Sequence, residues 1–504
     1  MNDTEARSLS PGDEKSHSLA HAGHNTDTNV PEIDHVAEKK LVRKLDMWIV
    51  PPVMLLYLFS FLDRVNIGNA RLYGLEEDLG MAGNQFQTAV SILFVTYILS
   101  ELPSNLVIKK FTPSRWLAFL TTAWGITATL TGITQSYGGL IACRLVLGAL
   151  EGGLFPGLTI YLTLFYTRRE IALRVGYLFV SAAISGSVGG LLAYGIGFMD
   201  GVAGQRGWRW IIIPNVLTSN GIIEGLPTFV LGIAVWWWLA DNPETARYLT
   251  PEEKQLVIIR KERQSGYSKS ADEFIKADVL KGLKDWKIWM FCLGQFGVDT
   301  MLYGYSTFLP TIIRGLGTWS SAEVQCLTIP CYALGAITYL IVAWFSDRFQ
   351  QRGIATVTFG LVSIVGYAIL ISPAANGAKY FGCFLVAMGL YVVVGIPLGW
   401  LPANNPRYGK RTTATGLQLT CGNLSGIMAP FIYQTQDGPR YITGHAVSLA
   451  MVAMAVIIYA IMWFYFLGMN KKRAAGKEDW KNEGKSEEEV KELGDESPHF
   501  VYTY

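Results

Sequence analysis

The sequence predicts an all-α membrane protein with twelve transmembrane helices in two six-helix lobes. Of its 504 residues, 50% are hydrophobic and only 16% are charged, whereas about 25% of residues are charged in a typical soluble domain. Apolar runs of about 20 residues, the length needed to cross a bilayer, recur along the chain. The 52 glycines suit closely packed membrane helices, because small residues let helix backbones approach each other.

The apolar runs fall into two sets of six, separated by a polar linker. Residues 1–40 are rich in Ser, Asp and His, and we expect them to form a disordered cytoplasmic tail. The first lobe, 41–240, contains the runs 48–66, 86–108, 116–133, 138–164, 172–199 and 211–240. A linker, 241–285, leads to the second lobe, 286–470, with the runs 286–313, 324–345, 354–371, 380–402, 413–434 and 446–467. Residues 471–504 form a second polar tail.

Basic residues predict the orientation in the membrane. Every second loop is rich in Lys and Arg, as are the linker and the segments flanking the first and last spans. These residues include Lys39, Lys40, Arg43, Lys44, Arg115, Arg168, Arg169, Arg174, Arg411, Lys471, Lys472 and Arg473. Because cytoplasmic loops carry the excess of positive charge, both termini and the linker are predicted to be cytoplasmic. We expect a multi-pass protein of the plasma membrane.

Arg144 and Glu151 are the most informative charged residues, because both lie within the fourth apolar run, in the segment RLVLGALEGGLFPG. Two helical turns separate them, so they share one face of a helix. Ionisable side chains within a membrane usually face a cavity or a partner. An arginine there can clamp a carboxylate, and a glutamate can carry a proton. The alternative is a fixed Arg144–Glu151 ion pair that only holds the helix in place.

Several motifs resemble those of a known transporter family. Two six-span halves around a basic linker are typical of the major facilitator superfamily, and AWFSDRFQQRG resembles its gate motif, with Asp347 and Arg348 as the charged core. In the first half, SELPSNLVIKKFTPSRW lacks this Asp-Arg pair and is similar to the fungal allantoate and nicotinate permeases, a branch of the anion:cation symporters. LDRVNIGNA, GWRW followed by EGLPT, FLPTII and the segment from KRTTATGLQ to PRYITGH agree with that family. The resemblance covers residues 41–470.

The resemblance implies roles for individual residues. Arg64 and Arg144 are expected to face the substrate anion, Glu151 to carry the coupling proton, and Glu101 to act in gating with Asp347 and Arg348. Two further candidate functional residues are identified by their position in the sequence alone. Asp63 adjoins Arg64 but points to another helix face, which fits capping or gating. Asp299 lies midway along the seventh span and outside any family motif, so we treat it as a second candidate for proton coupling.

Other classes of protein are not indicated. The chain has no P-loop, no GxGxxG unit before a helix, no HExxH and no GxSxG elbow, so we expect neither an enzyme nor a cofactor. The net charge of +2 and the dispersed basic residues argue against a nucleic-acid partner. Cys326 and Cys331 match no metal-ligand spacing, so no metal site is expected.

The sequence therefore predicts proton-coupled uptake of a small organic anion, such as a carboxylate vitamin or a ureide, by a monomeric carrier. An exporter or shuttle for a secondary metabolite is the alternative, because sequence does not fix the direction of transport. A sensor that binds without transporting is disfavoured by the short tails.

One stretch departs from the family. IIIPNVLTSNGII, residues 211–223, adds roughly eight residues between GWRW and EGLPT, with helix-breaking Pro214 and Gly221. It is either an extended outer loop or an error in the gene model.

Overall fold

The computed structural model describes residues 34–108, 111–201, 204–212, 225–265 and 275–504, and within these ranges the chain is helical without strands. Residues 213–223 of the stretch IIIPNVLTSNGII and the first 33 residues lie outside the described ranges. The first half contains α1 (His35–Leu72), α2 (Leu75–Asp78), α3 (Gln85–Val107), α4 (Pro113–Gly132), α5 (Tyr137–Glu151), α6 (Leu154–Phe165), α7 (Arg168–Gly197), α8 (Gly207–Ile212) and α9 (Gly225–Trp238). The linker contains α10 (Pro251–Ser265) and α12 (Lys276–Lys284).

The second half follows the linker directly. It contains α13 (Trp286–Arg314), α14 (Ser321–Phe349), α15 (Arg352–Ile371), α16 (Asn376–Ala403), α17 (Tyr408–Ile432), α18 (Ile442–Ala474) and the short α19 (Glu487–Glu492). Each predicted span coincides with a helix or, for the fourth, with two helices in succession, α5–α6, and the described residues of the sixth fall at the end of α8 and in α9. This arrangement confirms the predicted twelve-span, all-helical architecture.

Within the described residues, seven helical segments are long and apolar enough to cross a membrane, judged by length and composition alone. They are α1, α5–α6, α7, α14, α15, α16 and α18. Among the other predicted spans, α3, α13 and α17 pack against helices of the opposite half as well as their own.

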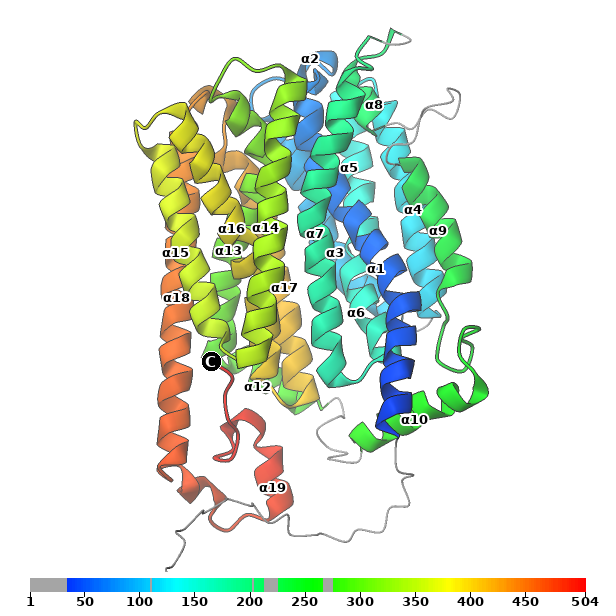
Figure 1. Cartoon of the computed structure of the whole chain (residues 1–504), viewed down its shortest axis with the longest axis vertical. Helices are drawn as coiled ribbons and strands as arrows, with labels where there is room; N and C mark the ends of the chain where they lie inside the picture. The colour runs from blue at the N-terminus through cyan, green and yellow to red at the C-terminus, as the bar shows by residue number, and fades with distance from the viewer. Residues whose placement is uncertain (1–33, 109–110, 202–203, 213–224, 266–274) are drawn as a thin grey trace, which may run out of the picture.

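The helices form two bundles side by side (Figure 1). Within the first half, α1 packs on α7, α3 on α5 and α4 on α9, whereas the second half packs α13 on α17 and α18, and α15 on α16. The halves are joined mainly by the pairs α3 with α17, α7 with α14, and α1 with α13, and α7 also contacts α16. We call the end with α10, α12 and α19 the basic end, and the end with α2 and α8 the far end.

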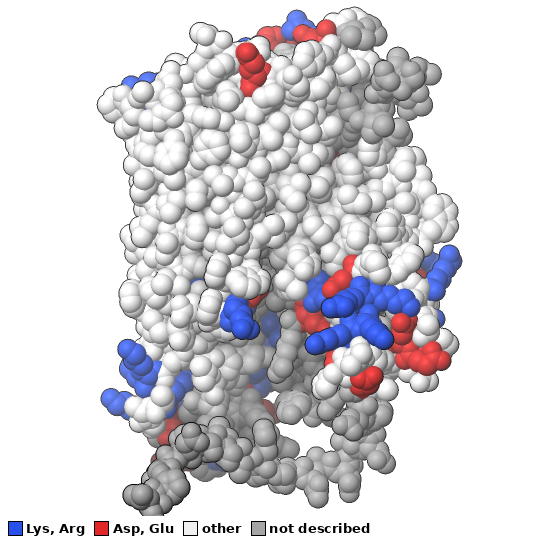
Figure 2. Space-filling model, viewed as in Figure 1, with Lys and Arg blue, Asp and Glu red and all other residues white. Residues whose placement is uncertain are grey.

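Charged side chains are distributed as expected for a membrane protein. Figure 2 shows a broad uncharged band, with Lys, Arg, Asp and Glu gathered mostly at the basic end. Trp236, Trp237 and Trp238 are exposed near the basic end of α9, where aromatic rings commonly meet the membrane interface.

Helix α1 extends well beyond its apolar run. It begins at His35, inside the range 1–40 expected to be disordered, because the Asp34 carboxylate caps it by accepting from the Val36 N–H at 2.8 Å. The helix contains Pro51 and Pro52, and prolines are tolerated within membrane helices where neighbours satisfy the freed carbonyls. The ordered start gives the linker a surface to bind: Lys44 pairs with Glu253 of α10 at 2.7 Å.

The segment after α18 is packed onto the second half. Asp495 is 3% exposed and pairs with Lys287 of α13 at 2.6 Å and with Lys410 of α17 at 2.7 Å. Burial raises the pKa of Asp495, but the two ammonium groups outweigh it and hold the pKa below its ordinary value. Beyond it, the Tyr504 carbonyl accepts from the Arg352 N–H at the start of α15 at 2.8 Å. The segment therefore ties the basic ends of α13, α15 and α17 together.

Candidate functional site

An ion pair between α1 and α5 lies at the centre of the candidate site. The Arg64 Nε donates to Glu151 Oε2 at 2.9 Å, and the Ser60 hydroxyl lies 3.5 Å from the same oxygen. The side chain of Glu151 is fully buried, and that of Arg64 is 11% exposed. A buried glutamate therefore faces an arginine from another helix, and each charge compensates the other.

Two more charged groups complete a cluster with Arg64 and Glu151. Arg144, on α5, is 4% exposed and lies within electrostatic reach of both Asp63 and Glu151. Asp63, 9% exposed, accepts from the indole N–H of Trp124 on α4 at 2.5 Å. We call these four charged residues, two arginines and two carboxylates, the charge cluster. With both carboxylates ionised its net charge is zero.

The fourth span is interrupted next to Glu151. Helix α5 ends at Glu151, and α6 begins at Leu154, with Gly152 and Gly153 between them. A Cβ atom on Gly152 would run into the Ser100 side chain and the Tyr97 carbonyl of α3. Only glycine allows this close approach, which brings Glu151 to the level of Arg64.

The guanidinium group of Arg64 is surrounded by aromatic rings. Its central carbon lies 4.8 Å from the ring centroid of Tyr97, 5.2 Å from that of Phe61 and 5.8 Å from that of Phe94. Cations are attracted to aromatic faces, most strongly where water is excluded. The rings hold the group in place while leaving its N–H donors for an anion.

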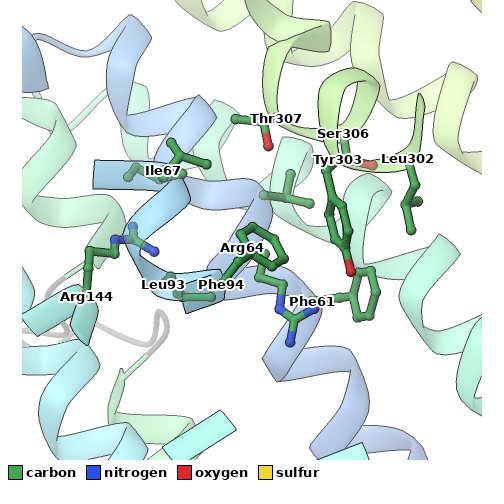
Figure 3. Close-up of a pocket in the computed structure, with 12 residues that line it drawn as sticks. Phe61, Arg64, Ile67, Leu93, Phe94, Arg144, Leu302, Tyr303, Ser306 and Thr307 are labelled. Carbon is green, nitrogen blue, oxygen red and sulfur yellow. The ribbon is translucent and has the colours of Figure 1, made fainter. Parts of the chain in front are cut away.

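A pocket opens beside the charge cluster, between the two halves. Figure 3 shows Arg64, Arg144 and Tyr303 reaching it from three different helices. Its lining is mostly apolar or aromatic, with hydroxyl groups on the α13 side. The residues that line it are Phe61, Arg64, Val65, Ile67, Val90, Leu93, Phe94, Arg144, Leu302, Tyr303, Ser306 and Thr307. Few convergent polar groups in an apolar wall are typical of a small-molecule site.

The second half lines the pocket with polar side chains. Among the described lining residues, both arginines come from the first half. The Tyr303 hydroxyl donates to Asn423 Oδ1 on α17 at 2.7 Å. One turn away, Asp299 accepts from Gln295 at 2.9 Å, and Gln295 accepts from Gln418 at 3.0 Å. Asp299 thus belongs to a buried hydrogen-bonded network between α13 and α17, separate from the charge cluster.

The predicted gating residues lie toward the basic end. Glu101, on α3 one turn beyond Tyr97, is 8% exposed, and its Oε2 atom has no hydrogen-bond partner among the described residues. Asp347 and Arg348 are exposed at the end of α14, and Asp347 pairs with Arg352 of its own half at 3.5 Å. Asp63 lies apart from these, inside the charge cluster.

Sequence reasoning missed several residues of the site. Trp124, Tyr97 and Tyr303 each contact a charged residue or the pocket, yet aromatic residues are common in membrane helices and gave no separate signal. The spacing of Arg144 and Glu151 indicated a shared helix face, but not that Arg64 would be the bonded partner of Glu151.

Comparison with known proteins identifies a protein family and several related transporters. Residues 53–430 match the family model described as Major Facilitator Superfamily. The chain is 42% identical over 447 residues to an uncharacterised transporter of Schizosaccharomyces pombe, covering 89% of this chain and 87% of the relative. It is 32% identical over 478 residues to the high-affinity nicotinic acid transporter of Saccharomyces cerevisiae, covering 95% of this chain and 87% of the relative.

A solved structure has the same fold. A bacterial homologue of the human lysosomal transporter Spinster, crystallised in an inward-facing and unoccupied conformation, aligns with a TM-score of 0.61 at 16% identity, covering 84% of this chain and 98% of that one. The twelve-span architecture, the family match and the transporter-named relatives agree that this is a transport protein and not an enzyme. The chain belongs to the major facilitator superfamily.

Proposed function

We propose that the protein takes up a small organic anion together with a proton by alternating access. The observation that carries this proposal is the bond between Glu151 and Arg64 inside the neutral charge cluster. An isolated charge is costly in a membrane interior. An anion that enters this cluster is therefore favoured when a proton enters with it, and Glu151 is positioned to accept that proton.

The exchange at Arg64 follows from hydrogen-bond geometry. Arginine offers planar donors that match a carboxylate and cannot lose its charge. A substrate carboxylate at Arg64 takes the place of Glu151, which becomes neutral by protonation. Arg144 provides the second guanidinium at the same pocket. When the pocket opens to the other side, loss of the proton restores the Glu151–Arg64 bond and favours release of the anion.

The pocket favours a compact anion with a flat apolar body. Phe61, Phe94 and Tyr303 present aromatic faces close to the two arginines. A relative at 32% identity is named as a nicotinic acid transporter, and nicotinate combines an aromatic ring with one carboxylate. We place the chain in the allantoate and nicotinate permease branch and take carboxylate vitamins and ureides as its substrate class.

The basic end is cytoplasmic by the positive-inside rule, which places both termini inside a plasma-membrane protein that works as a monomer. Residues 41–240 and 286–470 form the moving lobes around the 241–285 linker. Asp347 and Arg348 act with Glu101 at the cytoplasmic gate, and Asp299 is a secondary proton site.

Uptake of radiolabelled carboxylates in a permease-deficient yeast tests this function. We expect nicotinate or a related monocarboxylate to accumulate, faster at external pH 5 than at pH 7, with accumulation abolished by a protonophore. The matched neutral amide should not be taken up, because it lacks the charge that Arg64 and Arg144 bind. Accumulation that is insensitive to pH and protonophore would contradict proton coupling. Faster loss of preloaded substrate, without uptake, would favour the export alternative.

A further inference from the structure

The two halves meet at the far end through a second buried arginine, Arg71, which lies two turns beyond Arg64 on α1. Its side chain is 6% exposed and pairs with Glu76 of α2, its Nε lying 3.1 Å from Glu76 Oε1. Its Nη2 donates across the interface to the hydroxyl of Thr435, between α17 and α18, at 2.8 Å. One end of this contact therefore belongs to the first half and the other to the second.

Aromatic rings from both halves surround the same guanidinium group. Its central carbon lies 4.6 Å from the ring centroid of Phe86 on α3 and 5.8 Å from that of Phe308 on α13. Phe86 and Phe308 meet edge to face at 6.1 Å, and Phe308 stacks on Tyr433 at 5.1 Å. All three rings are at most 1% exposed. This layer separates the pocket from the far end.

Neighbouring contacts close the same end. The Leu72 carbonyl, at the end of α1, accepts from the Ser321 hydroxyl at 3.1 Å and from Arg314 at 3.4 Å. Helix C-termini leave such carbonyls without an intrahelical partner, and here the second half supplies the donors. On α3, the Ser91 hydroxyl donates to the Ile427 carbonyl of α17 at 2.9 Å.

We propose that Arg71 is the latch of the outer gate, closing the pocket at the far end while the basic end is open. Opening requires the halves to separate there. Glu76 and Phe86 move with Arg71, since they belong to the same half, whereas Thr435 and Phe308 are left behind. The ion pair with Glu76 therefore compensates the charge of Arg71 in both states, and only the contacts across the interface are exchanged for water.

The geometry also keeps this latch reversible. The Nη1 atom of Arg71 is buried without a hydrogen-bond partner among the described residues. A buried donor without a partner is costly, and this donor can be hydrated once the end opens. The closed state therefore does not hold Arg71 so tightly that the carrier stays shut.

Accessibility of the pocket from outside tests the latch without any assumption about substrate or proton coupling. Ser306, which lines the pocket, is replaced by cysteine as a reporter, and intact cells are treated with a membrane-impermeant thiol reagent. The protein without the reporter gives the background from native cysteines. Thr435→Val removes the bond across the interface, and Arg71→Lys keeps the charge but cannot hold Glu76 and Thr435 in the same fork. We expect labelling to be about threefold faster with Thr435→Val and about tenfold faster with Arg71→Lys.

Thr134→Val is the matched control. The Thr134 hydroxyl donates only to the Thr131 carbonyl of its own half at 2.8 Å, so labelling should stay at the rate of the parent. Surface abundance is measured for each variant. If Arg71→Lys is depleted, Thr435→Val decides, because Thr435 is exposed at the start of a short 3-10 helix between α17 and α18, and its loss should not prevent folding. Parental labelling rates in Thr435→Val would overturn the latch, whatever the substrate proves to be.

Discussion

At the scale of single residues, the function we propose depends on a charge cluster whose members come from two helices, α1 and α5. Arg64 and Asp63 are neighbours on α1, and Arg144 and Glu151 share a face of α5. Buried charges are stable only when they are paired. In the function we propose, the balance between two arginines and two carboxylates links anion binding to protonation.

The first prediction concerns Arg144. Arg144→Lys keeps the positive charge but loses the planar fork that binds both oxygens of a carboxylate. We expect initial uptake at low substrate concentration to fall by about tenfold or more, the equivalent of one charge-assisted hydrogen bond. Uptake is measured together with surface abundance. A protein with normal abundance and normal uptake would remove Arg144 from the binding site.

The second prediction concerns the bond between Trp124 and Asp63. Trp124→Phe keeps the ring but leaves a buried carboxylate without its indole donor, which should cost about 1–3 kcal/mol of stability. The melting temperature of the purified protein in detergent measures this. Trp116→Phe is the control, because the Trp116 indole donates to the neutral hydroxyl of Ser104 and is partly exposed. Equal melting temperatures for the two variants would show that the hydrogen bond to Asp63 contributes no more to stability than the one between Trp116 and Ser104.

At the scale of elements, the break between α5 and α6 is what brings Glu151 to Arg64. Gly152→Ala should destabilise the protein, because its methyl group meets the backbone of α3 as well as a side chain. Gly195→Ala in α7 is the matched control: its methyl group meets nothing within 4 Å, and alanine favours a helix over glycine by about 1 kcal/mol. We expect a lower melting temperature for the first variant and an unchanged or higher one for the second. The same change in both would contradict the close approach at Gly152.

Sequence periodicity predicted the helical spans well, because each needs a long apolar run to cross a bilayer. It did not predict the break at Gly152, since a glycine pair within an apolar run is compatible with a continuous helix. Nor did it predict which helices would pair. The contact between Glu151 and Arg64 depends on how α1 packs against α5, and no local pattern around either residue encodes that packing.

At the scale of the whole molecule, the terminal segment ties the second half together at the basic end. Asp495→Asn should release it, because Lys287 and Lys410 lose their shared buried carboxylate. Faster cleavage of this segment in limited proteolysis would show the release. Glu496→Gln is the control, since Glu496 is exposed.

The pH dependence of this docking follows from the lowered pKa of Asp495. A depressed pKa in the folded state contributes stability above the unfolded value, about 3.9 for Asp, and that contribution is lost as the pH falls through the lower folded value. Proteolysis of the parent should therefore be the same at pH 5 and pH 7, whereas Asp495→Asn should be cleaved faster at both. Equal resistance of the Asn variant and the parent would contradict the docking.

The most direct test of the account is whether Glu151 carries the coupled proton. Glu151→Gln keeps the size and much of the hydrogen bonding of the side chain but cannot exchange a proton. We predict a protein at the cell surface that no longer accumulates substrate in response to external acid, yet still exchanges labelled for unlabelled substrate, because exchange needs no net proton movement. If Glu151 and Arg64 form only a structural ion pair, the variant should instead be depleted, because breaking a buried pair costs about 3–5 kcal/mol. A well-expressed Glu151→Gln protein that still concentrates substrate when the medium is acidified would contradict the account.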